Sequence, residues 1–259
     1  MNNAMSKVES FFIKKNKIEK QSTNIPYIIV DNFPDLGLLT ALRFLEWALD
    51  NPAGVISLPT GKTPEYFIKW THYLLNNWGS DDVLNICKKH NLNSKRKPNL
   101  SGLKFVQIDE FYPLSPYQHN SFFNYVNKYY LEGFKLSKSD SLLINTNHIA
   151  LYNNQSWNVI FPGGVIDLSL RYRDAITDIE KTQKESIFLI DQWCNQYEEK
   201  IRNMGGIGFF LGGIGPDGHI AFNVRGSDHN STTRLMETNF ETQAAAATDL
   251  GGIEVSRNR

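Results

Sequence analysis

The chain has 259 residues, of which 41% are hydrophobic and 21% charged, a composition typical of a folded globular protein with a sizeable core. Lys plus Arg and Asp plus Glu each number 27, and this zero net charge argues against recruitment to nucleic acid or an anionic membrane. No stretch reaches the roughly 18 apolar residues of a membrane-spanning helix. The two cysteines match no metal-ligand spacing, and we expect a cytoplasmic protein with reduced thiols.

The apolar pattern predicts helices that alternate with strands. In the first half we expect helices over residues 4–20, 36–49 (with Asp35 as N-cap), 64–76 and 81–89, and strands over 27–30, 55–58 and 103–108. In the second half we expect a helix over 121–131, a strand over 141–145, an irregular segment over 147–165, a long helix over 166–203 with a break near Thr182, and a buried strand over 207–211. This alternation favours an α/β fold whose mostly parallel sheet carries helices on both faces.

A first polar cluster, Pro59-Thr60-Gly61-Lys62-Thr63-Pro64, follows the strand predicted over 55–58. A strand that enters a glycine turn and then a helix presents backbone N–H groups that bind anions. Lys62 adds a charge and Thr63 adds a hydroxyl donor. The segment is not a P-loop, because Ile56 stands where that motif requires its first glycine. The alternative interpretation is a helix cap that binds no ligand.

A second cluster, Asp109-Glu110, ends the strand predicted over 103–108. A carboxylate at the end of a buried strand can act as a general base, because partial desolvation raises its pKa toward neutrality. The alternative interpretation is that the two carboxylates cap the turn before Pro113.

The third cluster follows the apolar run from Ile207 to Leu211 and begins with Gly212-Gly213. Asp217 and His219 come next among small residues. Open α/β sheets place their ligands beyond the carboxyl ends of the strands, and a carboxylate near an imidazole can set its tautomer. The alternative interpretation is a tight glycine turn with an incidental histidine.

Together, the segments 58–64, 107–111 and 211–223 resemble the glucosamine-6-phosphate deaminase/isomerase family, relatives of the 6-phosphogluconolactonases. The resemblance spans roughly residues 25–255, apart from an apparent insertion around 147–185. It implies a Rossmann-like α/β fold of the deaminase/phosphosugar-isomerase type, with one domain over residues 1–259 and a sugar-phosphate ligand. It also implies that no metal or cofactor is needed and, by analogy alone, that the protein is a homo-oligomer.

The resemblance assigns chemical roles to matched residues. Asp109 would move a proton between C1 and C2 of the open-chain sugar, and Asp217 and His219 would serve ring opening. The resulting reaction converts glucosamine 6-phosphate to fructose 6-phosphate and ammonia. Substrate and phosphate binding would fall to the other matched residues: Thr60, Gly61, Lys62, Thr63, Gly213 and Arg234.

The chain departs from the family pattern in three places. Val224 stands where a family glutamate supports the catalytic histidine, so His219 would need another partner, Asp228 or Glu110. A further phosphate-binding arginine is missing from residues 242–249, a loss that costs about 1.5–3 kcal/mol for one charge-assisted contact. The family's last strands and helix, with a phosphate-binding lysine, are expected beyond Arg259, as in a chain truncated at its C-terminal end.

The sequence therefore predicts an amino-sugar-phosphate deaminase/isomerase. Two alternatives stay open. Val224 and the missing arginine favour a non-catalytic, regulatory sugar-phosphate-binding module. A hydrolase similar to 6-phosphogluconolactonase would keep the histidine and would need no base at C2.

Overall fold

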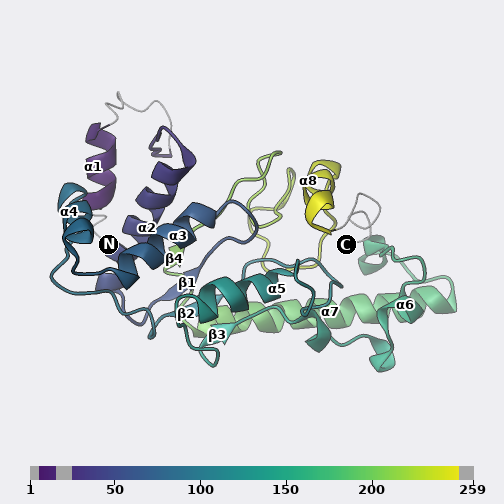
Figure 1. The fold of residues 1–259 in the computed structure, drawn as a ribbon. Coiled ribbons are helices and arrows are strands. Elements are labelled where there is room, and N and C mark those ends of the chain that lie inside the picture. The colour runs from purple at the N-terminus through teal and green to yellow at the C-terminus, as the bar shows by residue number, and fades with distance from the viewer. Residues whose placement is uncertain (1–5, 16–24, 251–259) are drawn as a thin grey trace.

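The computed structural model describes residues 6–15 and 25–250 (Figure 1). Its sheet has four parallel strands in the order β3-β2-β1-β4, so the predicted α/β class is confirmed. Ile56 of β1 lies opposite Phe105 of β2 and Phe209 of β4. The strands are β1 (Val55–Ser57), β2 (Lys104–Val106), β3 (Ser141–Leu142) and β4 (Phe209–Phe210).

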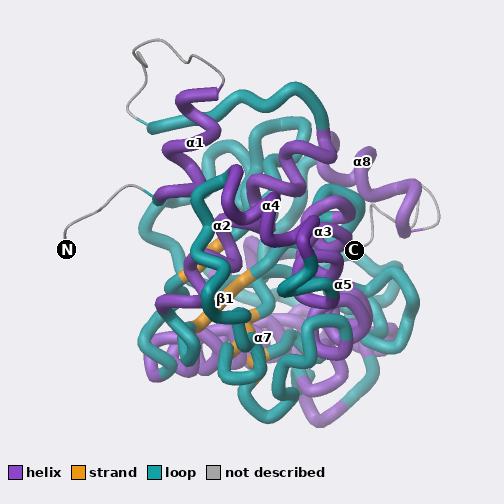
Figure 2. Tube along the Cα trace, turned by 60° about the vertical axis from the view of Figure 1, so that its left-hand side comes forward, coloured by secondary structure: helices purple, strands orange, loops and turns teal. Residues whose placement is uncertain are grey.

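Helices cover both faces of this sheet, as Figures 1 and 2 show. Ile56 and Phe105 belong to the main core with α1 to α4, whereas Val55 and Val106 pack against α7. Alternate side chains of a strand point to opposite faces, which explains this division. The helices are α1 (Lys7–Lys15), α2 (Phe33–Asp50), α3 (Glu65–Asn76), α4 (Asp81–Lys89), α5 (Phe122–Tyr125), α6 (Trp157–Ile160), α7 (Asp178–Asn203) and α8 (Phe240–Leu250).

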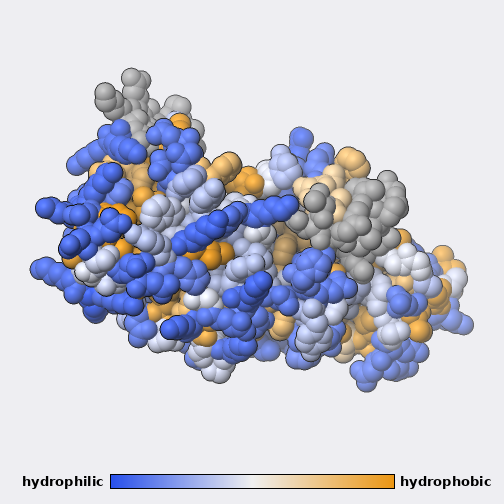
Figure 3. All heavy atoms as spheres, viewed as in Figure 1, coloured by the Kyte–Doolittle hydropathy of each residue, from blue (hydrophilic) through white to orange (hydrophobic). Residues whose placement is uncertain are grey.

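The outer surface, on the face shown in Figure 3, is mostly hydrophilic, as the composition of the chain led us to expect for a folded globular protein. Hydrophilic side chains cover most of the face shown in Figure 3, over the helices of the main core in particular. Within the described residues no helix is long and apolar enough to cross a membrane. Cys87 and Cys194 are both buried and free, as expected for a chain without a disulfide framework.

Two predictions for the first half were wrong. Residues 27–30 do not form a strand in the described part of the chain, and Tyr27 and Ile29 are 42% and 63% exposed. The N-cap of α2 is Asn32, whose side chain accepts a hydrogen bond from the Asp35 backbone N–H at 2.8 Å. The part of the first predicted helix over residues 16–20 lies outside the described residues.

The second half also differs from expectation. The helix predicted over 121–131 changes after α5 into a π-helical turn, Val126–Glu132. The segment expected to be irregular contains α6 and two short 3₁₀ turns, Thr146–His148 and Tyr152–Asn154. The long helix α7 begins only at Asp178, because Thr177 and Glu180 form a capping box there. No break occurs at Thr182, whose hydroxyl donates to the Ile179 carbonyl within the helix.

Strand β4 is not the buried strand that its apolar residues predicted. In the described sheet it pairs with β1 alone, so its other side lies at the edge. Ile207 is 36% exposed and Phe210 is 46% exposed. The glycine-rich segment that follows therefore leaves the sheet from an edge position.

Candidate active site

The three polar clusters meet at one edge of the sheet. Strands β2, β1 and β4 are neighbours and run parallel, so their carboxyl ends point the same way. A cavity of about 180 Å³ lies beyond these ends, between the loops after β1 and β4 where the strand order reverses. Open α/β sheets bind ligands at such a switch point. The polar and glycine residues of its lining are Thr60, Thr63, Asp109, Gly213, Gly215 and His219.

The loop after β1 contributes Thr60 and Thr63 to this cavity. Helix α3 begins after Pro64, its N-cap residue, and no side-chain hydrogen bond caps it, which argues against the alternative interpretation of the segment as a helix cap that binds no ligand. Gly61 and Lys62 lie instead on a neighbouring cavity beside Glu65. Gly61 has φ +81°, a left-handed conformation that turns the loop between Thr60 and Lys62.

The two carboxyl groups of the loop after β2, those of Asp109 and Glu110, differ in their hydrogen bonds. Glu110 accepts hydrogen bonds from three backbone N–H groups, those of Phe111 (3.0 Å), Phe122 (3.1 Å) and Phe123 (2.7 Å). Burial raises the pKa of Glu110 to about 7, against the lowering effect of these bonds. Because two of the donors belong to the first turn of α5, Glu110 caps that helix, a role different from the predicted capping of the turn before Pro113.

Asp109 is held differently, by its backbone alone. Its carbonyl accepts from the Gln107 side-chain amide at 2.9 Å, while its buried Oδ1 has no hydrogen-bond partner within the described residues. Burial, and then the negative charge of Glu110, raise the pKa of Asp109 to about 7. A carboxyl group with this pKa can take up or release a proton at neutral pH.

The loop after β4 carries a carboxylate–imidazole pair. Nδ1 of His219 lies 2.5 Å from Oδ1 of Asp217, and Asp217 stands behind the imidazole, outside the lining of the cavity. The ring rests against Gly215: a Cβ added there would lie 2.1 Å from Cε1 of the imidazole. The predicted pairing of the two side chains is therefore present, and Gly215 makes room for it.

Two residues that the sequence did not suggest complete this pair. Asn239 donates to Oδ2 of Asp217 at 2.6 Å, and Oγ1 of Thr242 lies 3.0 Å from Nδ1 of His219. The Asn239 hydrogen bond is the main cause that lowers the pKa of Asp217. An asparagine just before the Ala-rich run is an N-cap signal for α8, yet no pattern in the sequence links it to Asp217.

The two replacements expected for the glutamate missing at Val224 were wrong. Glu110 is occupied by the backbone of α5, and Asp228 accepts from the Asn230 backbone N–H in its own loop at 2.8 Å. Among the described residues, Asp217 and Thr242 are the polar partners of the His219 imidazole.

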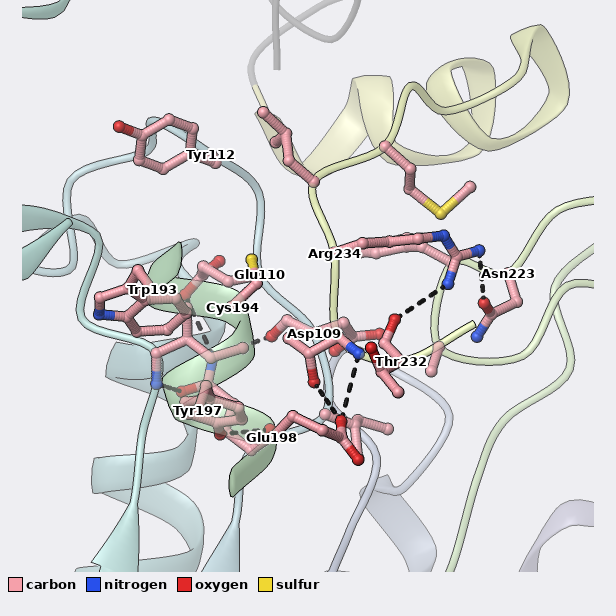
Figure 4. A pocket seen from close by; sticks show the side chains of 18 of the residues that line it. Asp109, Glu110, Tyr112, Trp193, Cys194, Tyr197, Glu198, Asn223, Thr232 and Arg234 are labelled. Carbon is pink, nitrogen blue, oxygen red and sulfur yellow. Dashed lines mark hydrogen bonds between the residues drawn. The ribbon is translucent and has the colours of Figure 1, made fainter. Parts of the chain in front are cut away.

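A second cavity, of about 390 Å³, lies on the α7 side of the same strand ends (Figure 4). Asp109 borders both cavities, whereas Arg234 lines the larger one and donates to Oδ1 of Asn223 at 2.9 Å. Arg234 is thus not brought together with Thr60 and Thr63. Ala221 and Phe222 line both cavities, and both have the left-handed φ that L-residues rarely adopt, +52° and +58°.

These features define a doubly wound α/β protein with a candidate small-molecule site at its switch point. Across residues 6–15 and 25–250, no three His, Cys, Asp or Glu side chains gather closely enough to hold a metal ion. The cavity has two acid/base groups. One is the carboxyl of Asp109, whose pKa is raised to about 7, and the other is the imidazole of His219, which contacts the Asp217 carboxylate.

Comparison with known proteins identifies the relatives of this chain. It is 31% identical over 169 residues to a glucosamine-6-phosphate deaminase of Borrelia hermsii. The aligned residues make up 65% of this chain and 58% of that protein. It is 28% identical over 176 residues to the enzyme of that name from Borreliella afzelii, covering 68% and 60%. A shorter stretch of 53 residues is 62% identical to the Bacteroides fragilis deaminase.

A solved structure shares the fold. The superposition has a TM-score of 0.58 at 21% sequence identity and covers 87% of this chain and 70% of the other. That structure was reported as a monomeric glucosamine-6-phosphate deaminase, a missing link of the NagB superfamily. No family model matches the chain. The chain is similar in sequence to glucosamine-6-phosphate deaminases, as its motifs predicted, and spans about three fifths of the length of the Borrelia hermsii and Borreliella afzelii proteins.

Proposed function

We propose that this protein is an amino-sugar-phosphate deaminase/isomerase that converts glucosamine 6-phosphate and water to fructose 6-phosphate and ammonia. The observation that supports this best is the lining of the smaller cavity, which combines the Thr60–Thr63 loop with Asp109 and His219. Aldose–ketose isomerisation needs a base near the carbon beside the carbonyl and an acid near the ring oxygen.

In this proposal His219 opens the sugar ring. Its Nδ1 faces Asp217, so Nε2 takes the proton of the C1 hydroxyl and passes it to the ring oxygen as the bond between C1 and that oxygen breaks. Asp109 then takes the proton from C2 and returns it to C1, while a proton of the amine passes to the C1 oxygen, and an imine is left at C2. Addition of water to that carbon releases the amine as ammonia. The unpartnered Oδ1 of Asp109 suits this role, because no competing hydrogen bond must be broken first.

Phosphate would bind at the N-terminus of α3, through backbone N–H groups and the hydroxyls of Thr60 and Thr63. The described lining of this cavity includes no Lys or Arg. We therefore expect weaker phosphate binding than a charge-assisted site would give, by about 1.5–3 kcal/mol for each missing contact. This observation keeps a non-catalytic sugar-phosphate-binding module as the second candidate.

The test is the simultaneous measurement of ammonia and fructose 6-phosphate during incubation with glucosamine 6-phosphate. We expect equal amounts of both products, and a loss of about 10²- to 10⁴-fold in kcat for Asp109→Asn, the usual contribution of a general base. Asp178→Asn is the matched control, because that side chain is 98% exposed on α7.

Two other results would redirect the proposal. A sugar phosphate that raises the melting temperature of the wild type without forming product would favour the binding module. Hydrolysis of 6-phosphogluconolactone without ammonia release from the amino sugar would favour the hydrolase. Wild-type turnover that survives Asp109→Asn unchanged would contradict the role given to Asp109.

A further inference from the structure

We propose that the first turn of α8 positions the acid/base histidine, with Asn239 and Thr242 supplying the support that Val224 cannot. This inference rests on the proposed function for its kinetic consequence, although its structural part stands on the contacts of α8 alone. Val224 has no side-chain hydrogen-bonding group, so the polar contacts of His219 and Asp217 must come from elsewhere.

Asn239 joins the start of α8 to the Asp217 carboxylate. Its Oδ1 accepts the Thr242 backbone N–H at 2.9 Å, which is the bond of an N-cap residue. Its Nδ2 donates to Oδ2 of Asp217 at 2.6 Å. One side chain therefore caps the helix and fixes the carboxylate, so the position of Asp217 depends on the folding of α8.

Thr242 completes the contact with the imidazole. The residue is 1% exposed, and its Oγ1 lies 3.0 Å from the same Nδ1 that faces Oδ1 of Asp217 at 2.5 Å. Two oxygen atoms around one ring nitrogen, one of them a carboxylate oxygen, favour a proton on Nδ1. The lone pair of the neutral ring then lies on Nε2, the nitrogen that our proposal gives to the sugar.

The loop that carries His219 needs this external support. Residues 213–239 hold no strand of the sheet, and within them Ala221 and Phe222 adopt left-handed backbone conformations. Strained backbone persists where surrounding contacts determine it. Phe222 also contacts the imidazole, with the ring centroids 5.6 Å apart, but an aromatic ring cannot select a tautomer. The hydrogen bonds of Asn239 and Thr242 can select one tautomer of His219.

The test uses substitutions that separate capping from positioning. Asn239→Asp keeps a good N-cap, yet it replaces the donor by a carboxylate facing Asp217. Thr242→Val removes the hydroxyl at nearly constant volume, and Thr242→Ser retains it. Glu241→Gln, on the exposed side of the same turn, is the control.

The first readout is the ¹⁵N NMR spectrum of the histidine rings, with the His219 signals assigned through His219→Gln. We expect a proton on Nδ1 in the wild type, Thr242→Ser and Glu241→Gln, and a mixture of tautomers or a charged ring in Asn239→Asp. The second readout is kcat, which we expect to fall about tenfold in Asn239→Asp and severalfold in Thr242→Val, with KM nearly unchanged.

The inference is overturned if the His219 ring signals of Asn239→Asp and Thr242→Val match those of the wild type. It is also overturned if Thr242→Ser behaves like Thr242→Val, because loss of packing would then explain both. An absence of turnover in the wild type would contradict the proposed function only, since the ring signals report the tautomer without any substrate. Circular dichroism shows whether each variant still folds.

Discussion

The two sides of the candidate site are built in different ways. Asp109 follows the central strand β2, whose Phe105 is fully buried together with its partner Ile56 in β1. His219 follows an edge strand with a half-exposed Phe210, in a loop held by the side chains of Asp217, Asn239 and Thr242. Hydrophobic packing of the strand thus fixes the backbone that carries the proposed base, and polar contacts hold the histidine proposed to open the ring.

Substitutions on the two sides should therefore have different effects. A change in the packed side lowers the free energy of unfolding first, because its contacts are apolar and close-packed. A change in the polar side displaces a catalytic group at little cost in stability, because few apolar contacts depend on it.

The largest expected effect on stability belongs to Phe44→Ala in α2. Phe44 is fully buried and contacts the rings of Phe67, Phe134 and Phe209, with centroids 5.5–6.2 Å apart. We expect the free energy of unfolding to fall by about 3–5 kcal/mol in denaturant titrations. Phe33→Ala in the same helix is the control, since Phe33 is 71% exposed. Similar losses in both variants would show that α2 does not anchor the core.

Gly215→Ala should damage the polar side without unfolding the protein. The new Cβ would lie within 2.5 Å of three imidazole atoms of His219, so the ring must move. Such a displacement costs about ten- to a hundredfold in kcat. Gly213→Ala adds a methyl group at ordinary contact, 3.7 Å from Thr63, and should cost less. Full activity of Gly215→Ala, measured by ammonia release, would mean that the ring position is not critical.

The buried carboxyl of Asp109 should make stability depend on pH. Its folded-state pKa, about 7, is above the ordinary value of 3.8, so the folded protein binds more protons between these limits. Stability linked to Asp109 is therefore present below pH 4 and is lost as the pH rises toward 7, by up to about 1.4 kcal/mol per pH unit. Relative to the wild type, Asp109→Asn should gain stability over this range, whereas the exposed Asp178→Asn should not.

The smallest effect is expected for Thr238→Val, just before α8. Its Oγ1 is buried and has no hydrogen-bond partner within the described residues. Replacement of this hydroxyl by a methyl group should leave the free energy of unfolding unchanged or raise it by up to about 1 kcal/mol. A loss of more than that amount in denaturant titrations would reveal a polar contact of Thr238 in solution.

The sequence predicted the packed side of the molecule better than the polar side. The apolar runs at 55–58 and 103–108 identify central strands because both faces of such strands are buried. The apolar runs at 27–30 and 207–211 have the same appearance, but burial depends on neighbouring elements, which a local pattern does not contain. Thr60, Asp109 and His219 were found because each follows a strand or stands among glycines.

The support of His219 could not be predicted in this way. Asn239 and Thr242 lie 22 and 23 residues from the side chains they contact, and only the folded chain brings them together. The sequence also could not predict that Lys62 and Arg234 lie outside the lining of the smaller cavity. Lys62 follows the left-handed Gly61 and lines a neighbouring cavity. Arg234 lines the larger cavity, and it is the left-handed Ala221 and Phe222 that line both.

The central claim is that Asp109 is a proton-exchanging group kept unpaired in the cavity, and its own titration tests this most directly. The side-chain carboxyl ¹³C signal, assigned by its absence in Asp109→Asn, can be followed by NMR from pH 4 to pH 8. We expect the midpoint of this titration near pH 7, far above the pKa of an ordinary aspartate. A midpoint near 4 would contradict it, because the carboxyl would then be solvated or paired and would not be poised to act as the base.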